Sequence, residues 1–253
     1  MKKASDTLKK TLQQGFIPIF VSDGVDPIME VEACLETGLQ VIEFTLRRND
    51  AREMIPEIRR RYPEITLLVG STMDSETMVG RLKSRIPQLM SLKELEEAGA
   101  DGFVSMLDFT PETLAKYRKT HLLIPTASTV AEAFRLAEGG AHCIKVLGSY
   151  ENTVRTVCSA PAFSFAPIFV TGGMTPDTIP RFADFGAAIF AAGFDIMLKG
   201  KSENAPRQSY VDALKLFVEA ALSARARHYP EIDKALASPN WRHSLPWSFA
   251  EDI

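Results

Sequence analysis

Lys145 is the residue of this sequence whose surroundings point most directly to chemistry. It lies within HCIKVL at positions 142–147, with apolar residues on both sides, in a run short enough for a buried strand. Burial disfavours the ammonium form and lowers the pKa of a lysine, and the neutral amine that results is a nucleophile toward ketones. The alternative is a lysine at a strand end whose stem packs while its charged head reaches solvent.

Glu43 repeats this pattern with a carboxylate, inside the apolar run VIEFT. Because side chains alternate along a strand, Glu43, Thr45 and Arg47 leave it on the same side. A buried carboxylate is paired, protonated or solvated in a cavity, so an ion pair with Arg47 or Lys145 that only stabilises the core is one interpretation. The other is catalytic, because an imine-forming amine and a proton-moving carboxylate are the parts of a Schiff-base lyase.

Thr171-Gly172-Gly173 is a candidate anion site. It follows an apolar run and precedes a helix expected over 175–185, so its backbone amides would point at a bound anion. Gly193, at the end of the last apolar run, adds an unobstructed amide. Many turns contain Gly-Gly, so the position of this tripeptide carries more weight than its composition.

These residues belong to a regular alternation of eight apolar runs with helical patterns, which predicts a parallel sheet closed into a (β/α)8 TIM barrel. A doubly wound open sheet is the alternative, but G-x-G-x-x-G and P-loop patterns are absent. The strands are expected at 16–21, 39–45, 65–70, 102–106, 121–126, 142–147, 167–171 and 187–192, and the helices at 25–37, 48–62, 75–97, 110–119, 128–138, 151–160, 175–185 and 206–227.

Three segments lie outside this alternation. Residues 5–14 predict an N-terminal helix, and Pro87 interrupts the long connection 73–95, where we expect two helices separated by a break. The tail over 228–253 holds both tryptophans, which are seldom left in water. We therefore expect a single catalytic barrel domain over 1–227 and a C-terminal extension over 228–253 that packs on the barrel or on a neighbouring subunit.

The expected strands end in polar residues, and in such barrels the active site lies at these ends. Because the C-terminal ends of parallel strands meet at one mouth, we expect these residues to converge. They are Glu43, Thr45 and Arg47 on the second strand, Ser71 and Thr72 after the third, Ser105 on the fourth, Thr126 on the fifth, Lys145 on the sixth, Thr171, Gly172 and Gly173 on the seventh and Gly193 on the eighth.

Composition limits the partners. The 253 residues have a net charge of -3, with 29 basic residues scattered among 32 acidic ones, so we expect no nucleic-acid partner. No apolar run approaches the roughly 18 to 20 residues that cross a membrane, and the three cysteines show no C-x-x-C pairing. We expect a cytoplasmic protein with no membrane partner.

The histidines are poorly placed for a metal at the mouth. His121 and His142 begin their expected strands, whereas His228 and His243 lie in the tail. A metal-dependent class II aldolase needs ligands at the strand ends. We therefore expect neither a metal nor a cofactor.

At these strand ends the chain resembles the 2-keto-3-deoxy-6-phosphogluconate (KDPG) / 2-keto-4-hydroxyglutarate (KHG) aldolases, class I enzymes that form homotrimeric barrels. The resemblance covers about residues 15–198. The family's E-x-T-L-R stands as 43–47, its G-T as 71–72, its E-A-G-A as 97–100, its P-x-x-S-T as 125–129, its Schiff-base lysine motif as 144–146 and its T-G-G as 171–173.

The resemblance implies a class I aldolase that cleaves a 2-keto-3-deoxy (phospho)sugar acid or a 2-keto-4-hydroxy acid to pyruvate and an aldehyde, as a homo-oligomer, a trimer in the family. It implies that Lys145 forms the imine and that Glu43 acts as general acid and base. The residues it implies for substrate binding are Arg47 and Thr72 at the pyruvate carboxylate, and Thr171, Gly172, Gly173 and Gly193 at a distal phosphate.

The sequence departs from the family pattern at four strand ends. Leu147 replaces the aromatic residue of K-x-F-P-A, and Val21 stands where a basic residue is common. Ser105-Met106-Leu107 replaces S-P-G, and Gly193 stands in place of a serine. These departures concern the aldehyde half of the substrate.

Two other functions remain open. Another phosphate-binding barrel, an isomerase or a thiamine-phosphate-type synthase, would share T-G-G but would not need a nucleophilic lysine. A non-catalytic sugar-acid-binding barrel would be stabilised by its ligand without turnover. Trapping an imine distinguishes the aldolase from both.

Overall fold

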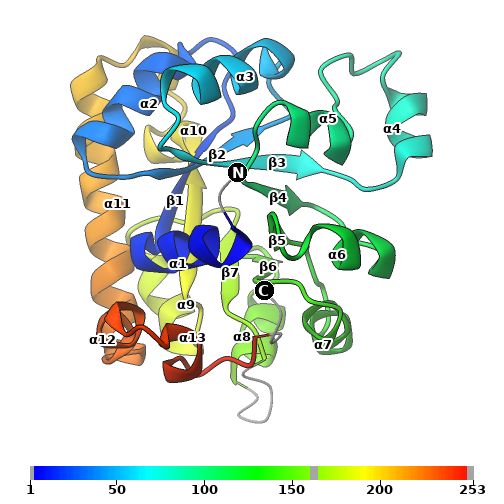
Figure 1. Ribbon diagram of the computed structural model, residues 1–253. Coiled ribbons are helices and arrows are strands. Elements are labelled where there is room, and N and C mark those ends of the chain that lie inside the picture. The colour runs from blue at the N-terminus through cyan, green and yellow to red at the C-terminus, as the bar shows by residue number, and fades with distance from the viewer. Residues whose placement is uncertain (1–2, 160–164, 250–253) are drawn as a thin grey trace.

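The computed structural model describes residues 3–159 and 165–249, in which eight parallel strands form a barrel with helices on the outside (Figure 1). Neighbouring strands follow the order β5-β4-β3-β2-β1-β8-β7-β6. A bridge between Thr126 and Lys145 links the two ends of this order, so the barrel is nearly closed. The (β/α)8 fold and the N-terminal helix predicted from the sequence are confirmed.

The strands lie within the predicted segments, except that β3 and β8 end two residues and one residue later than predicted, and most of the predicted helices also lie within their segments. Helix α11 is the longest, with 22 residues, and it packs against α2 and α9. In the described ranges, no helix combines the length and the apolar character needed to cross a membrane. The strands are β1 (Phe16–Phe20), β2 (Val41–Thr45), β3 (Thr66–Thr72), β4 (Gly102–Ser105), β5 (Leu122–Ile124), β6 (Ile144–Leu147), β7 (Ile168–Thr171) and β8 (Ile189–Gly193), and the helices are α1 (Ala4–Gln14), α2 (Pro27–Glu36), α3 (Ala51–Arg61), α4 (Glu76–Leu82), α5 (Leu92–Glu97), α6 (Pro111–Tyr117), α7 (Val130–Glu138), α8 (Glu151–Ser159), α9 (Ile179–Phe185), α10 (Phe194–Met197), α11 (Arg207–His228), α12 (Ile232–Ala237) and α13 (Trp241–Ser244).

Alternation along the strands separates two apolar layers. Val41 and Cys143 belong to the cluster that fills the barrel, whereas Ile42 and Ile144, the next residues along each strand, pack with the outer helices. Side chains two residues apart lie on the same face of a strand. The side chains of Glu43 and Lys145, two positions after Val41 and Cys143, are therefore directed into the barrel.

The long connection after β3 forms two helices separated by a break, as predicted. Ser91 and Glu94 build a capping box that begins α5. Arg52 from α3 donates to the carbonyl oxygens of Pro87 and Leu89, at 2.8 and 2.6 Å. The segment between α4 and α5 is therefore held to α3 by hydrogen bonds from the Arg52 side chain to its backbone carbonyls.

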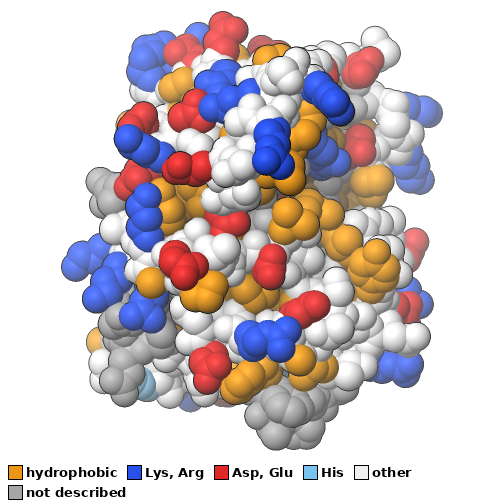
Figure 2. Space-filling model, turned by 90° about the vertical axis from the view of Figure 1, so that its right-hand side faces the viewer, with side chains coloured by type: hydrophobic (Ala, Val, Ile, Leu, Met, Phe, Trp, Pro, Cys, Tyr) orange, Lys and Arg blue, Asp and Glu red, His pale blue; other side chains and the backbone are white. Residues whose placement is uncertain are grey.

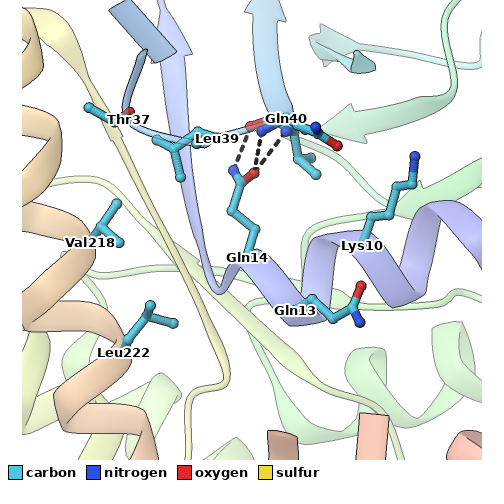
Figure 3. A pocket seen from close by; sticks show the side chains of 10 residues that line it. Lys10, Gln13, Gln14, Thr37, Leu39, Gln40, Val218 and Leu222 are labelled. Carbon is cyan, nitrogen blue, oxygen red and sulfur yellow. Dashed lines mark hydrogen bonds between the residues drawn. The ribbon is translucent and has the colours of Figure 1, made fainter. Parts of the chain in front are cut away.

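Helix α1 is tied to the N-terminal ends of the strands through Gln14 (Figure 3). Its amide nitrogen donates to the carbonyl oxygens of Phe16 and Val41, and its amide oxygen accepts from the backbone N–H groups of Gln40 and Val41. Figure 3 shows Gln14 beside a hollow of about 350 Å³ between α1, the start of β2 and α11. The polar groups of Gln14 are thus used to fix α1 under the barrel.

The described part of the tail covers the same end of the barrel. Ile232, Leu236, Trp241 and Trp247 pack in one cluster with Leu8 and Leu12 of α1 and with the inward-facing strand residues. The hydroxyl of Tyr229 donates to the carbonyl oxygen of Gly186, just before β8. The tail therefore lies at the N-terminal ends of the strands, opposite the mouth.

Candidate active site

Lys145 lies inside the barrel on β6. Its side chain is only 3% exposed, and its Nζ donates to Sδ of Met106 at 3.3 Å. A thioether is a weak, uncharged acceptor, so this contact does not replace the hydration that a buried ammonium loses. Burial lowers the pKa of Lys145, although the carboxylate of Glu43 acts in the opposite direction. The site therefore favours the neutral amine.

Glu43 faces the same interior from β2. It is 3% exposed, and its Oε2 has no hydrogen-bond partner in the described part of the protein. Burial raises the pKa of Glu43, while the positive charges of Lys145 and Arg47 lower it. Neither Lys145 nor Arg47 forms an ion pair with it among residues 3–159 and 165–249. The arrangement thus lacks the direct pair that a purely structural role would require.

Gly70 of β3 makes room for this carboxylate. It is paired with Thr45 of β2, and a Cβ at Gly70 would overlap Oε1 of Glu43. Gly70 was not among the residues predicted for the site. A glycine inside the strand TLLVGST was the available signal, because it often marks close approach by another group.

The next residue, Ser71, has a left-handed backbone with φ of 61°. The register between β3 and β4 shifts at this point, between Gly70 and Thr72. Such a backbone is uncommon for residues other than glycine and tends to occur at functional sites. The backbone near the end of β3 is therefore strained at Ser71.

Two successive arginines after β2 have different environments. The side chain of Arg47 is exposed, and its charge reaches both Glu43 and Lys145 electrostatically. Arg48 is fully buried and donates to the carbonyl oxygens of Ser22 and Val25, at 2.6 and 2.8 Å, as well as to two carboxylates. Arg47 is therefore available to an anion, whereas Arg48 fixes the loop after β1.

Hydroxyl groups link the strand ends across one side of the mouth. Thr72 Oγ1 donates to the carbonyl oxygen of Val104 at 3.1 Å, Ser105 Oγ to that of Thr72 at 2.8 Å and Thr126 Oγ1 to that of Ser105 at 2.6 Å. Thr45 Oγ1 similarly donates to the β1 carbonyl of Phe20 at 3.1 Å. Their hydrogens are used by neighbouring strands, so these hydroxyls present only lone pairs to a ligand.

The Thr171-Gly172-Gly173 turn begins where β7 ends. Thr171 is buried, while both glycines are exposed and have φ of 86° and 72°, a region that favours glycine. The carbonyl of Thr171 accepts from the N–H of Gly148 at 2.7 Å. A Cβ at Gly148 would lie 2.6 Å from the carbonyl oxygen of Gly172. Gly148, which stands at the proline position of K-x-F-P-A, thus permits close contact between the ends of β6 and β7.

The helix expected to start at Thr175 is shorter than predicted. Helix α9 begins at Ile179. Thr175 and Thr178 close a turn instead, in which each side-chain oxygen accepts from the backbone N–H of the other. This local hydrogen bonding competes with helix formation and separates the T-G-G turn from the helix terminus.

The histidines at the opposite end have structural partners. His142 Nδ1 accepts from the N–H of Leu123 at 3.0 Å, and Nε2 lies 3.0 Å from the carbonyl oxygen of Arg118. Burial lowers the pKa of His142 to about 4. The described residues contain no group of three or more histidines, cysteines and acids arranged to hold a metal.

The structure brings the predicted site residues to one end of the barrel, and known proteins share both the fold and the sequence pattern. The profile of the KDPG and KHG aldolase family matches residues 8–209. The 2-dehydro-3-deoxy-6-phosphogalactonate aldolase of Escherichia coli K12 is 24% identical over 207 residues, which are 80% of this chain and 95% of that protein.

Solved structures agree in fold. The KDPG aldolase of Zymomonas mobilis has a TM-score of 0.63 at 18% identity, covering 86% of this chain and 97% of that one. The KDPG aldolase of Legionella pneumophila, with pyruvate captured as a covalent carbinolamine, has a TM-score of 0.62 at 15% identity, covering 88% and 98%. At these identities the structures show the shared fold, whereas the profile match over most of the chain shows the family. The chain belongs to the KDPG and KHG aldolase family and is a class I aldolase, a carbon–carbon lyase.

Proposed function

We propose that Lys145 is the imine-forming nucleophile of this aldolase and Glu43 its general acid and base. The observation that carries the proposal is the state of the amine: Nζ is buried, its pKa is lowered by burial, and its partner is a thioether. The neutral amine attacks the ketone carbon of the substrate, and loss of water gives the imine. The carbinolamine of the Legionella pneumophila relative is the corresponding intermediate with pyruvate before that loss of water.

Cleavage then follows from the electron demand of the protonated imine. The hydroxyl on C4 gives up its proton to a base, the C3–C4 bond breaks and the aldehyde leaves. The bonding pair moves into the enamine of pyruvate. Protonation at C3 and hydrolysis of the imine release pyruvate and the free amine. Glu43 is suited to these proton transfers because burial raises its pKa above the ordinary value of a glutamate.

The substrate is a 2-keto-3-deoxy sugar acid or a 2-keto-4-hydroxy acid. Arg47 binds the carboxylate of the substrate. Two observations support this role: the Arg47 side chain is exposed, and it forms no ion pair in the described ranges. Thr45, Thr72 and Thr126 line the same mouth, and Thr171, Gly172, Gly173 and Gly193 lie toward the aldehyde end. The protein acts in the cytoplasm as a homo-oligomer, a trimer by resemblance to the family.

Borohydride reduction in the presence of pyruvate tests the proposal. The intact mass should rise by one pyruvate adduct, and peptide mapping should place it on Lys145. Lys145→Met should abolish the adduct, whereas Lys116→Met, a change of a lysine on α6 outside the site, should leave it unchanged. Labelling spread over surface lysines, or persisting in Lys145→Met, would exclude Lys145 as the nucleophile.

A further inference from the structure

A carboxylate occupies the mouth beside the end of β8. Ile189 and Ala191 face into the barrel, so Gly193, two residues further, has its α-hydrogen on the same inward side. A Cβ at Gly193 would overlap Oδ1 of Asp195 and lie 3.2 Å from Cγ2 of Val21. The side chain of Asp195 therefore turns back from α10 over Gly193, into the space between the ends of β8 and β1.

No countercharge accompanies this carboxylate in the described part of the chain. Asp195 has no side-chain hydrogen bond or ion pair there, and its neighbour Val21 is apolar. Lys199 and Lys201 follow on the same segment, but both are exposed and unpaired with Asp195 in those ranges. This sector of the mouth therefore presents an unpaired negative charge.

A second carboxylate lies against the loop after β1. A Cβ at Gly24, in the loop after β1, would lie 2.7 Å from Cδ of Glu203. The hydroxyls of Ser22 and Ser202 are 3.3 Å apart and join the same two segments. The loops after β1 and β8 are thus held together with acidic side chains on them.

The T-G-G turn lies next to this acidic sector. Strand β7 pairs with β8, with Thr171 opposite Ala191, so the turn at Gly172 and Gly173 follows the strand beside Asp195. A phosphate held by the backbone amides of that turn would place roughly two negative charges close to the carboxylate. A sugar hydroxyl would instead donate a hydrogen bond to it, because an ionised carboxylate only accepts.

We propose that Asp195 makes this aldolase selective for an aldehyde half that carries free hydroxyl groups rather than a phosphate. This inference rests on the aldolase function proposed above and specifies its substrate class as unphosphorylated 2-keto-3-deoxy sugar acids. The amides of Gly172 and Gly173 then bind hydroxyl or carbonyl oxygen. The carboxylate of Asp195 accepts a hydrogen bond from a substrate hydroxyl, whereas it would repel a phosphate at the same place.

The test compares two acceptors in the condensation direction, with pyruvate as the common partner. The acceptors are glyceraldehyde and glyceraldehyde 3-phosphate, which differ only in the phosphate. The wild-type enzyme should show a kcat/KM at least tenfold higher for glyceraldehyde. Asp195→Asn keeps the shape and removes the charge, so it should shift this ratio at least tenfold toward the phosphate, mainly through the KM of the phosphorylated acceptor.

Two controls separate this inference from the aldolase function itself. Asp212→Asn, on the exposed side of α11, should leave the acceptor ratio unchanged. The pyruvate adduct at Lys145 does not involve the aldehyde half, so its loss in the wild type would overturn the proposed function. With the adduct present, a wild-type preference for the phosphate, or a ratio unaltered by Asp195→Asn, would overturn the inference.

Discussion

Burial acts in opposite directions on the two groups at the centre of the site. It lowers the pKa of Lys145 and raises that of Glu43, and each opposes the other's shift by its charge. Both shifts favour a neutral amine beside a carboxyl group whose proton is available. These are the states in which an amine attacks a ketone and a carboxyl group exchanges protons with carbon.

Glu43→Gln tests this division of roles, because it keeps size and hydrogen-bonding capacity but removes the titrating group. The variant should still form the pyruvate imine slowly, while exchange of deuterium into the pyruvate methyl group should fall by about 10²- to 10⁴-fold, the usual contribution of a general base. Proton NMR of the methyl signal measures the rate. Near-normal exchange would mean that Glu43 has only a structural role.

His142 predicts how stability depends on pH. Burial lowers the pKa of its imidazole from 6.5 to about 4. Between these pH values the imidazole is therefore protonated in the unfolded chain but neutral in the folded protein. Stability is therefore fully present above pH 6.5 and falls as the pH drops toward 4. The loss approaches about 3 kcal/mol at 1.36 kcal/mol per pKa unit. In urea unfolding, the free energy of unfolding should fall more steeply with decreasing pH in the wild type than in His142→Gln, where the buried His121 still contributes. Equal slopes would contradict this prediction.

At the scale of elements, the loop after β1 depends on one buried ion pair. Arg48 Nη1 lies 3.1 Å from Oε2 of Glu30, with both side chains fully buried. Removal of Arg48 would leave Glu30 as an uncompensated buried charge, which typically costs about 3 to 5 kcal/mol. Because Arg47 is exposed, its removal carries no such cost.

This contrast gives a matched pair of variants. Arg48→Met should lower the melting temperature markedly, whereas Arg47→Met should change it little and raise the KM for pyruvate. Calorimetry and steady-state kinetics measure the two effects. Adding Glu30→Gln to Arg48→Met should restore part of the lost stability, because it removes the buried charge. Equal melting temperatures for the two single variants would contradict the assignment.

Local periodicity was sufficient to predict the strands and the inward position of Glu43 and Lys145, because alternation is a property of the strand itself. Asp195 was not predictable in this way. Its position depends on the short helix α10, and it lies over Gly193 on the side where Val21, 174 positions away in the sequence, also approaches. The start of α9 was predicted too early, because hydrogen bonds between Thr175 and Thr178 replace its first turn.

The hydroxyl groups of Thr72, Ser105 and Thr126 show the same limit. Their residue type and their position at strand ends predicted polar groups at the mouth. The sequence did not predict that each hydroxyl donates to a neighbouring strand. Which neighbour accepts a side-chain hydrogen bond depends on the register between strands, which a single sequence does not specify. The residues that alternate within one element were predictable, whereas contacts between elements were not.

At the scale of the whole molecule, the mouth and the tail lie at opposite ends of the barrel. Hydrophobic side chains gather among charged ones on the side that carries α4 to α7 (Figure 2). Three of the large exposed apolar residues, Met106, Leu107 and Tyr150, follow strand ends. Met106 also contacts Lys145, so apolar surface extends from the amine of Lys145 toward solvent.

The tail contributes to stability at the other end. Trp241 and Trp247 are 9% and 6% exposed, and they pack in one cluster with α1 and the barrel interior. Arg225, just before the tail, donates to the carbonyl oxygen of Leu12, and its Nη2 lies 3.5 Å from Asp233. The tail thus packs against the N-terminal helix. Truncation of a buried tryptophan typically lowers the free energy of unfolding by about 3 to 5 kcal/mol.

A chain that ends at Arg227 should therefore fold with a lower melting temperature and still form the pyruvate adduct, because the removed segment, as far as the structure describes it, lies at the opposite end of the barrel from the mouth. Since the family resemblance implies a trimer without such a tail, light scattering should find the shortened chain in the same oligomeric state as the full chain. Trp247→Ala is a milder change, and the melting temperature of this variant should fall between those of the full and the shortened chain.

Conversion of the shortened chain to a monomer would mean that the tail builds the subunit interface. Loss of the adduct with the fold retained would mean that the tail acts on the mouth, contrary to its position under the barrel.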